Sequence, residues 1–224
     1  MSDFRIVPAG DAAWLVEWPA RIDPALSARA VAFAQQAKRL HDAVRDVVVG
    51  YCSVTVYFDP VQIDGGDLEG ELRRLALAIP DAVTADGAEI DVDVCYGGEL
   101  GPDLPDVAAF AGLSESEVID LHTSRTYRVY VVGFVPGFPY MARVDDRLAV
   151  PRRSTPRLRV PAGSVAIAAG QTGIYPSETP GGWHLIGRTR LKPYDDARMN
   201  PFLFKPGDRV RFHSIDRAQF DRMA

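Results

Sequence analysis

Apolar residues recur at helical spacing in two segments of the first third of the chain. The first segment begins at Asp23-Pro24, a typical helix start because the acid caps the N-terminus and Pro fits the first helical position. The second follows the turn Asp64-Gly65-Gly66 and ends at Pro80. The pattern predicts two amphipathic helices, whose apolar faces are Leu26, Ala30, Phe33, Ala34, Ala37 and Leu40 in the first and Leu68, Leu72, Leu75, Ala76 and Ile79 in the second.

Four other segments of this region are typical of strands. Phe4–Pro8, Ala13–Trp18 and Val44–Phe58 are rich in β-branched and aromatic residues, and Gly50 predicts a break within the third. Glu89–Tyr96 alternates apolar with polar residues. Two helices over a mostly antiparallel sheet make a small α+β sandwich.

The pattern changes beyond this point. Gly97–Pro102 is dense in turn formers, and two short helices are predicted after it, at Pro105–Ala111 and Ser114–Thr123. From residue 126 onward, short β-type runs alternate with Gly and Pro, a pattern that favours a barrel or a sandwich. We therefore expect two domains, residues 1–88 and 89–224, with an exposed, protease-sensitive connection at Gly97–Pro102.

The composition and charge of the chain exclude some classes of function and favour others. The chain has 224 residues, 47% hydrophobic and 25% charged, as in ordinary globular proteins. The net charge is −5, yet residues 125–192 carry 11 Lys and Arg against 3 Asp and Glu, a local balance of +8 that favours anion binding. An acidic chain without a long basic helix argues against a nucleic-acid partner. No apolar run approaches the roughly 20 residues of a membrane span, and two cysteines outside any CxxC motif predict a reduced, cytoplasmic protein.

The common nucleotide, metal and nucleophile motifs are absent, and the four histidines are too dispersed to predict a metal site. The informative residues lie in Pro- and Gly-rich loops between residues 133 and 189. Guanidinium groups there suit carboxylate or phosphate, amide and hydroxyl groups suit a lactam or urea, and aromatic rings supply walls. The alternative is a set of tight barrel turns with solvated arginines. The pocket hypothesis takes Arg152, Arg157, Gln171, Thr172, Tyr175 and Arg188 as substrate-binding and Phe138, Pro139 and Trp183 as wall residues.

His122 is the candidate catalytic residue. Its helix face is expected to pack, which favours a buried histidine with satisfied hydrogen bonds. It also precedes the strand that leads into the Pro-Gly loops, so a general acid–base role stays open. Cys52 and Cys95 fall in strand patterns and are interpreted as small core residues.

Several longer runs resemble a known family. The segments Tyr96–Glu99 and His122–Ser124, with the runs GQTGIYP and PGGWHLIGRT, are similar to the B-type subunits of 5-oxoprolinase, to allophanate hydrolase subunit 1 and to KipI-type kinase inhibitors, the carboxyltransferase C/D subdomain family. The resemblance runs from about Phe4 to Phe212. Two places depart from it: Ala142-Arg143 stands where the family has Gly-Gly, and Leu191–Asp196 replaces a Leu-Phe-Asp-Pro run. The resemblance implies an N-terminal ferredoxin-like α/β sandwich and a C-terminal cyclophilin-like β-barrel.

The resemblance also implies a function. Such a protein opens 5-oxoproline to glutamate at the expense of ATP, together with a C-type partner (the allophanate hydrolase subunit 2 type) and an A-type hydrolase partner. ATP is then expected to bind jointly with the partner, since this chain lacks nucleotide motifs. The substrate is a small anion. Arg152, Arg157 or Arg188 would neutralise either its carboxylate or the phosphoryl oxygens, while Gln171, Thr172 and Tyr175 hold the lactam. The alternatives are a role in carboxyl transfer or allophanate (urea) metabolism and inhibition of a sensor histidine kinase.

Overall fold

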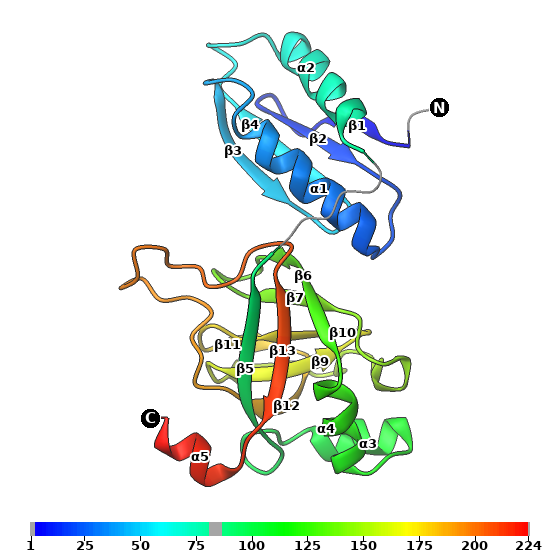
Figure 1. The fold of residues 1–224 in the computed structure, drawn as a ribbon, viewed down its shortest axis with the longest axis vertical. Coiled ribbons are helices and arrows are strands. Elements are labelled where there is room, and N and C mark those ends of the chain that lie inside the picture. Colours follow the sequence, from blue (N-terminus) through cyan, green and yellow to red (C-terminus); the bar gives the residue numbers. More distant parts are fainter. Residues whose placement is uncertain (1–2, 81–86, 224) are drawn as a thin grey trace. The chain divides into compact units, whose positions relative to one another are not determined.

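The computed structural model describes residues 3–80 and 87–223. The chain folds as two compact units, Met1–Asp86 and Gly87–Ala224, each with a hydrophobic core of its own (Figure 1). Among the described residues, no helix has the length and apolar character that crossing a bilayer would require.

The first unit is a four-stranded antiparallel sheet with two helices. The first helix begins where the sequence predicts, and the second begins at Gly65, within the turn predicted to precede it. In both, the carboxylate of the preceding aspartate, Asp23 or Asp64, accepts hydrogen bonds from backbone N–H groups of the first turn. The sheet order is β1-β2-β4-β3. Its elements are β1 (Arg5–Pro8), β2 (Ala13–Glu17), α1 (Pro24–Ala37), β3 (Val44–Val49), β4 (Ser53–Phe58) and α2 (Gly65–Ala78).

The connectivity of this unit differs from the ferredoxin-like prediction. A ferredoxin-like chain runs β-α-β-β-α-β, with one strand before the first helix. Here two strands precede α1 and are paired as a hairpin, so the chain runs β-β-α-β-β-α. The ferredoxin-like assignment is therefore not confirmed, although the strands and helices themselves agree with the predicted ones.

The second unit contains a closed seven-stranded barrel, which confirms the predicted barrel architecture. The order around it is β10-β7-β6-β13-β5-β12-β9, and β8 and β11 form a separate two-stranded sheet. The strands are β5 (Glu89–Tyr96), β6 (Thr126–Val132), β7 (Pro139–Ala142), β8 (Arg157–Val160), β9 (Ser164–Ala168), β10 (Gln171–Ile174), β11 (Thr179–Gly181), β12 (His184–Arg188) and β13 (Arg209–Ser214). The helices are α3 (Leu104–Ala111), α4 (Glu115–Thr123), the short 3-10 turn η1 (Asp146–Leu148) and α5 (Arg217–Arg222).

The turn-rich segment at 97–102 lies within the second unit and does not connect the two units. The backbone N–H of Gly97 donates to the carbonyl oxygen of Ile186 at 3.0 Å. Gly101 packs so closely against β12 that a Cβ there would lie 2.1 Å from the same oxygen. Turn formers mark a change of direction, and here the chain turns within the barrel unit to enter α3.

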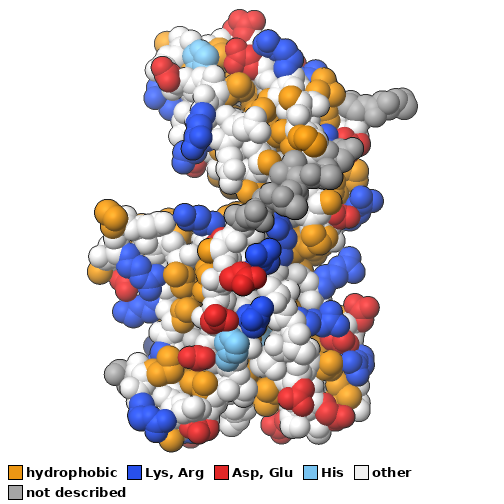
Figure 2. Space-filling view, viewed as in Figure 1, with side chains coloured by type: hydrophobic (Ala, Val, Ile, Leu, Met, Phe, Trp, Pro, Cys, Tyr) orange, Lys and Arg blue, Asp and Glu red, His pale blue; other side chains and the backbone are white. Residues whose placement is uncertain are grey.

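The outer surface of the barrel carries paired charges where β5 and β13 run in parallel. Asp91 faces His213 at 2.6 Å, and Glu89 faces Arg209 at 3.3 Å. Acidic and basic side chains accordingly alternate on this face (Figure 2). Exposed ion pairs of this kind contribute little to stability. Because their charges are paired with one another, this face does not indicate a binding site.

Candidate functional site

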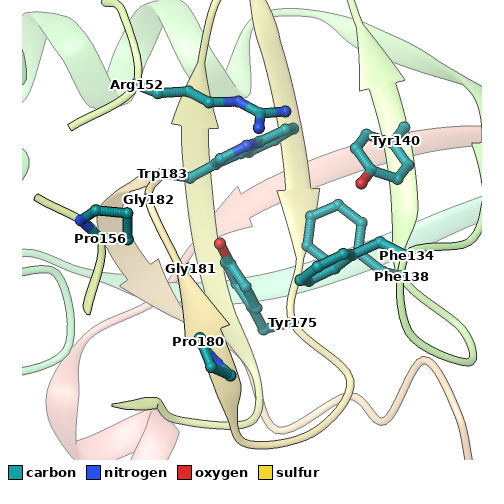
Figure 3. A pocket seen from close by; sticks show the side chains of 10 residues that line it. All are labelled: Phe134, Phe138, Tyr140, Arg152, Pro156, Tyr175, Pro180, Gly181, Gly182 and Trp183. Atoms are coloured by element: carbon teal, nitrogen blue, oxygen red, sulfur yellow. The ribbon is translucent and has the colours of Figure 1, made fainter. Parts of the chain in front are cut away.

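A small aromatic pocket opens on the barrel unit, between the loops that precede β7, β8 and β12. Its volume is about 200 Å³. The loops bring together rings, prolines, glycines and one guanidinium group from segments far apart in the sequence (Figure 3). The lining residues are Phe134, Phe138, Tyr140, Arg152, Pro156, Tyr175, Pro180, Gly181, Gly182 and Trp183.

Phe138 is the central ring of the pocket wall. Its ring centroid lies 5.0 Å from that of Tyr175 and 5.5 Å from that of Trp183, both in edge-to-face geometry, and 4.7 Å from that of Tyr140. Edge-to-face contacts are a favourable arrangement of aromatic rings. The ring also packs closely against β10, because a Cβ on Gly173 would come within 2.6 Å of it. The wall is therefore fixed before any ligand enters.

The rim of the pocket carries a strained residue, Phe134. Its φ is +66°, and the N–H of Val135 donates to the carbonyl oxygen of Gly133 at 2.8 Å, which makes Phe134 the central residue of a γ-turn. Its side chain is 62% exposed and makes an edge-to-face contact with Phe138. Backbone strain of this kind is concentrated at binding sites, and here it holds an aromatic ring at the entrance.

Arg152 supplies the positive charge of the pocket. Within the part of the chain that the structure describes, its side chain forms no hydrogen bond or ion pair, and it extends beside Trp183 (Figure 3). Burial raises the pKa of the hydroxyls of Tyr140 and Tyr175, an effect that the charge of Arg152 partly opposes. Both phenols are therefore protonated at neutral pH and can donate hydrogen bonds. The pocket thus offers a cation, two hydroxyl groups and apolar walls.

Arg157, a predicted substrate-binding residue, does not line the pocket, and its guanidinium group is bound within the protein. Two of its guanidinium nitrogens donate to the two carboxylate oxygens of Asp103, each at 2.7 Å. Arg153 donates to the same carboxylate at 2.9 Å, and so does the backbone N–H of Leu185 at 2.7 Å. Asp103 is 2% exposed. This Asp103 cluster (Asp103, Arg153, Arg157 and the Leu185 N–H) anchors the loop that carries Arg152.

Asp103 also belongs to a group of three side chains whose geometry resembles a metal site. Ligand atoms of Asp103, Asp106 and His184 lie within 4.8 Å of one another. Both carboxylate oxygens of Asp103 already accept from guanidinium groups, however, and a cation would have to compete with those two positive charges. The arrangement is therefore explained as an ion-pair cluster.

His122 and Thr172 lie in the barrel core and not in the pocket. His122 is completely buried, with Nδ1 2.7 Å from the Tyr96 hydroxyl and Nε2 2.9 Å from Thr172 Oγ1. The Thr172 hydroxyl donates to the Ala166 carbonyl oxygen, so Nε2 carries the proton and Nδ1 accepts. Burial lowers the pKa of His122 to about 3. Neither residue lines the pocket, so the geometry of the pocket gives no support to the catalytic role predicted for His122 or to the lactam contact predicted for Thr172.

The other predicted site residues that remain, Pro139, Gln171 and Arg188, lie outside the aromatic pocket. Pro139 is buried at the beginning of β7, and Gln171 is half-buried at the beginning of β10; neither lines the pocket. Arg188 lines a different cavity. Sequence reasoning missed Tyr140, although a strand pattern could have found it, because residues two apart in a strand share a face and Phe138 is a candidate wall residue.

Fold and site together define a mixed α/β protein whose barrel unit carries a small aromatic pocket lined by one guanidinium group. Residues 4–204 match the family model for the carboxyltransferase domain, subdomain C and D. The chain belongs to this family, which confirms the resemblance seen in its loops.

Proteins named as the B subunit of 5-oxoprolinase are among the relatives. The one from Haemophilus influenzae is 40% identical over 210 residues, covering 93% of this chain and 96% of the relative. The one from Escherichia coli O157:H7 is 53% identical over 132 residues, covering 59% of this chain and 61% of the relative. The match to the second thus spans less than two thirds of its length.

Solved structures show the same fold within longer chains. The structure of TTHA0988 is 38% identical with a TM-score of 0.80, and the match covers 91% of this chain and 40% of that one. The urea amidolyase of K. lactis has a TM-score of 0.79 at 19% identity, covering 98% of this chain and 15% of that one. The second likeness is informative about the fold alone.

Proposed function

We propose that this chain is the B-type subunit of an ATP-dependent 5-oxoprolinase and that its aromatic pocket binds the carboxylate end of 5-oxoproline. The observation that carries this proposal is the guanidinium group of Arg152, which has no hydrogen-bond or ion-pair partner in the described residues and stands beside an aromatic pocket. A carboxylate supplies the planar pair of acceptors that a guanidinium fork binds best.

The size and chemistry of the pocket fit a compact ring compound. At about 200 Å³ the pocket is smaller than the sites of drug-sized ligands, which take roughly 300–1,000 Å³. The flat lactam ring packs against Phe138 and Trp183, and the hydroxyls of Tyr140 and Tyr175 donate to the lactam carbonyl oxygen. Asp103 does not contact the substrate in this proposal. It acts as a positioning residue, because it fixes the loop that presents Arg152.

The chain works with partner proteins in this proposal. ATP phosphorylates the lactam oxygen and leaves as ADP. One water molecule then adds to the activated carbon, and the C–N bond breaks as the nitrogen takes up a proton, which gives γ-glutamyl phosphate. A second water molecule hydrolyses this acyl phosphate to glutamate and phosphate. Partners of the C type and A type supply the nucleotide site and the remaining hydrolytic groups, and this chain holds the substrate. The names of the 5-oxoprolinase relatives support this division, because a B subunit implies that the enzyme has others.

Urea chemistry is the second candidate. Relatives named putative urea carboxylase and urea amidolyase are 25% and 29% identical over little more than half of this chain. Urea has no carboxylate, so its carbonyl oxygen could accept a hydrogen bond from Arg152 but would give it no anionic partner. The two substrates are therefore distinguished by the dependence of activity on Arg152.

The test is reconstitution. The chain is co-purified with its partner proteins, and formation of glutamate and ADP is measured with 5-oxoproline and, separately, with urea. We expect activity with 5-oxoproline in the complex and none from the isolated chain. Arg152→Gln should raise the KM for 5-oxoproline about ten- to a hundred-fold. Arg159→Gln is the matched control, because Arg159 is exposed and paired with Glu178. Turnover by the isolated chain, or turnover of urea alone by the complex, contradicts the proposal.

A further inference from the structure

A second cavity on the barrel unit is lined by cations and, within the described part of the chain, by no acidic residue. Its volume is about 350 Å³. Among the described residues, none lines both this basic cavity and the aromatic pocket. The lining residues are Ala162, Gly163, Pro176, Arg188, Thr189, Arg190, Leu191, Lys192 and Met223.

Arg188, the last residue of β12, is the most informative member. Its Nε is buried and has no hydrogen-bond partner, and no ion pair to a described acid is formed. Burial lowers the pKa of Arg188, and the neighbouring charge of Arg190 lowers it further. A buried guanidinium nitrogen without a partner costs free energy. A ligand anion would remove that cost.

The turn at Gly163 explains why Arg188 is enclosed. Gly163 has a φ of +78°, and a Cβ there would lie 2.3 Å from the Thr189 carbonyl oxygen and 3.4 Å from the Arg188 side chain. The N–H of Thr189 also donates to the carbonyl oxygen of Gly163 at 2.9 Å. The β8–β9 turn therefore packs directly on the end of β12 and fixes the place of the guanidinium group.

The other two cations of the basic cavity are only weakly engaged. Arg190 lies over the ring of Phe220, 4.3 Å from its centroid, and its Nε is 3.5 Å from a backbone oxygen. Lys192 forms an exposed pair with Asp195 at 3.6 Å. Exposed pairs of this kind are weak. Both cations can therefore turn toward an anion in the cavity at little cost.

We propose that the basic cavity around Arg188 is a binding site for a phosphate group. Three cations lining one cavity suit a multiply charged anion better than a single carboxylate, and Arg and Lys are both common phosphate-binding residues. The volume is enough for a phosphate group together with part of the molecule that bears it. The basic cavity shares no described lining residue with the aromatic pocket, so the phosphate site and the proposed 5-oxoproline site can be tested separately.

The experiment measures anion binding by the full chain at constant ionic strength. Inorganic phosphate, pyrophosphate and ATP are each titrated against the protein by calorimetry, with chloride as the balancing salt. We expect binding of at least one of the three. Binding of free phosphate indicates a free-anion source, whereas binding of ATP or pyrophosphate alone indicates a polyphosphate source. No binding of any of the three overturns the proposal.

Substitutions of the lining cations test whether the anion binds in the basic cavity. Arg188→Gln should weaken binding at least tenfold while leaving the melting temperature equal or higher, because it removes a charge that burial and Arg190 disfavour. Lys192→Gln is the second variant and should weaken binding a few-fold. Arg211→Gln, an exposed arginine on β13, is the matched control and should bind as wild type. Wild-type binding by both Arg188→Gln and Lys192→Gln overturns the proposal.

Discussion

The Asp103 cluster and the aromatic pocket take their arginines from the same short stretch of chain, residues 152–157, yet they use them in opposite ways. In the Asp103 cluster, Arg153 and Arg157 converge on one buried carboxylate, and both oxygens of that carboxylate are occupied. In the pocket, Arg152 has no hydrogen-bond or ion-pair partner in the described residues. The difference teaches that an arginine's role depends on whether the fold brings a carboxylate to it. Neighbouring arginines can therefore differ completely in function.

Removing the carboxylate of the Asp103 cluster should have the largest effect. Asp103→Ala leaves two guanidinium groups and the N–H of Leu185 without their acceptor. Breaking a buried pair by removing one partner costs about 3–5 kcal/mol. We expect the free energy of unfolding, measured in urea, to fall by that amount. Asp106→Ala is the control, since Asp106 is exposed and 3.8 Å from Arg153; equal losses in both variants would show that the cluster has no special role.

Adding a methyl group at Gly181, which lines the aromatic pocket, should lower stability less than Asp103→Ala does and should clearly weaken ligand binding. A Cβ at Gly181 would lie 2.3 Å from the hydroxyl oxygen of Tyr175. Gly181→Ala must therefore displace that ring, at a cost of about 1–3 kcal/mol. We expect a folded protein that no longer binds 5-oxoproline. Gly70→Ala, in α2, is the control, because a Cβ there would have no neighbour within 4 Å and Gly70 does not line the pocket. Normal binding by Gly181→Ala would contradict the assigned pocket.

Acid should weaken the barrel through His122, a structural group like those of the Asp103 cluster. Its folded-state pKa is about 3, below the unfolded value of 6.5. The unfolded chain therefore takes up the proton first, and stability is lost as the pH falls below 6.5 toward 3. Between pH 7 and pH 5 this loss is about 2 kcal/mol. Urea unfolding of wild type and His122→Asn at both values checks it, since the variant should lose less on acidification. An equal loss in both would assign the acid sensitivity to other groups.

Much of the fold was predictable because it depends on local pattern. Helical spacing and capping acids predicted both helices of the first unit, and alternation predicted β5. The same pattern placed two strands before the first helix, as the structure does, whereas the ferredoxin-like topology came from the resemblance alone and is not confirmed.

The aromatic part of the pocket was predictable for a similar reason. Phe138, Tyr175, Trp183 and Arg152 lie in Pro- and Gly-rich loops that fix where side chains point. The role of Arg157 was not predictable, because its partner lies 54 positions away and the absence of acids nearby in sequence suggested a free cation. The contact between Thr172 and His122 was not predictable either, because His122 comes from another element.

The most direct test of the central claim is a titration that reports on Trp183. This ring lines the pocket, whereas Trp14 and Trp18 belong to the other unit and give a constant background. The emission of the chain is followed with 5-oxoproline and with 2-pyrrolidinone, which has the same lactam ring and no carboxylate. We predict that wild type prefers 5-oxoproline by at least tenfold and that Arg152→Gln binds the two equally. A preference that survives in Arg152→Gln, or no response to 5-oxoproline in wild type, would contradict the account.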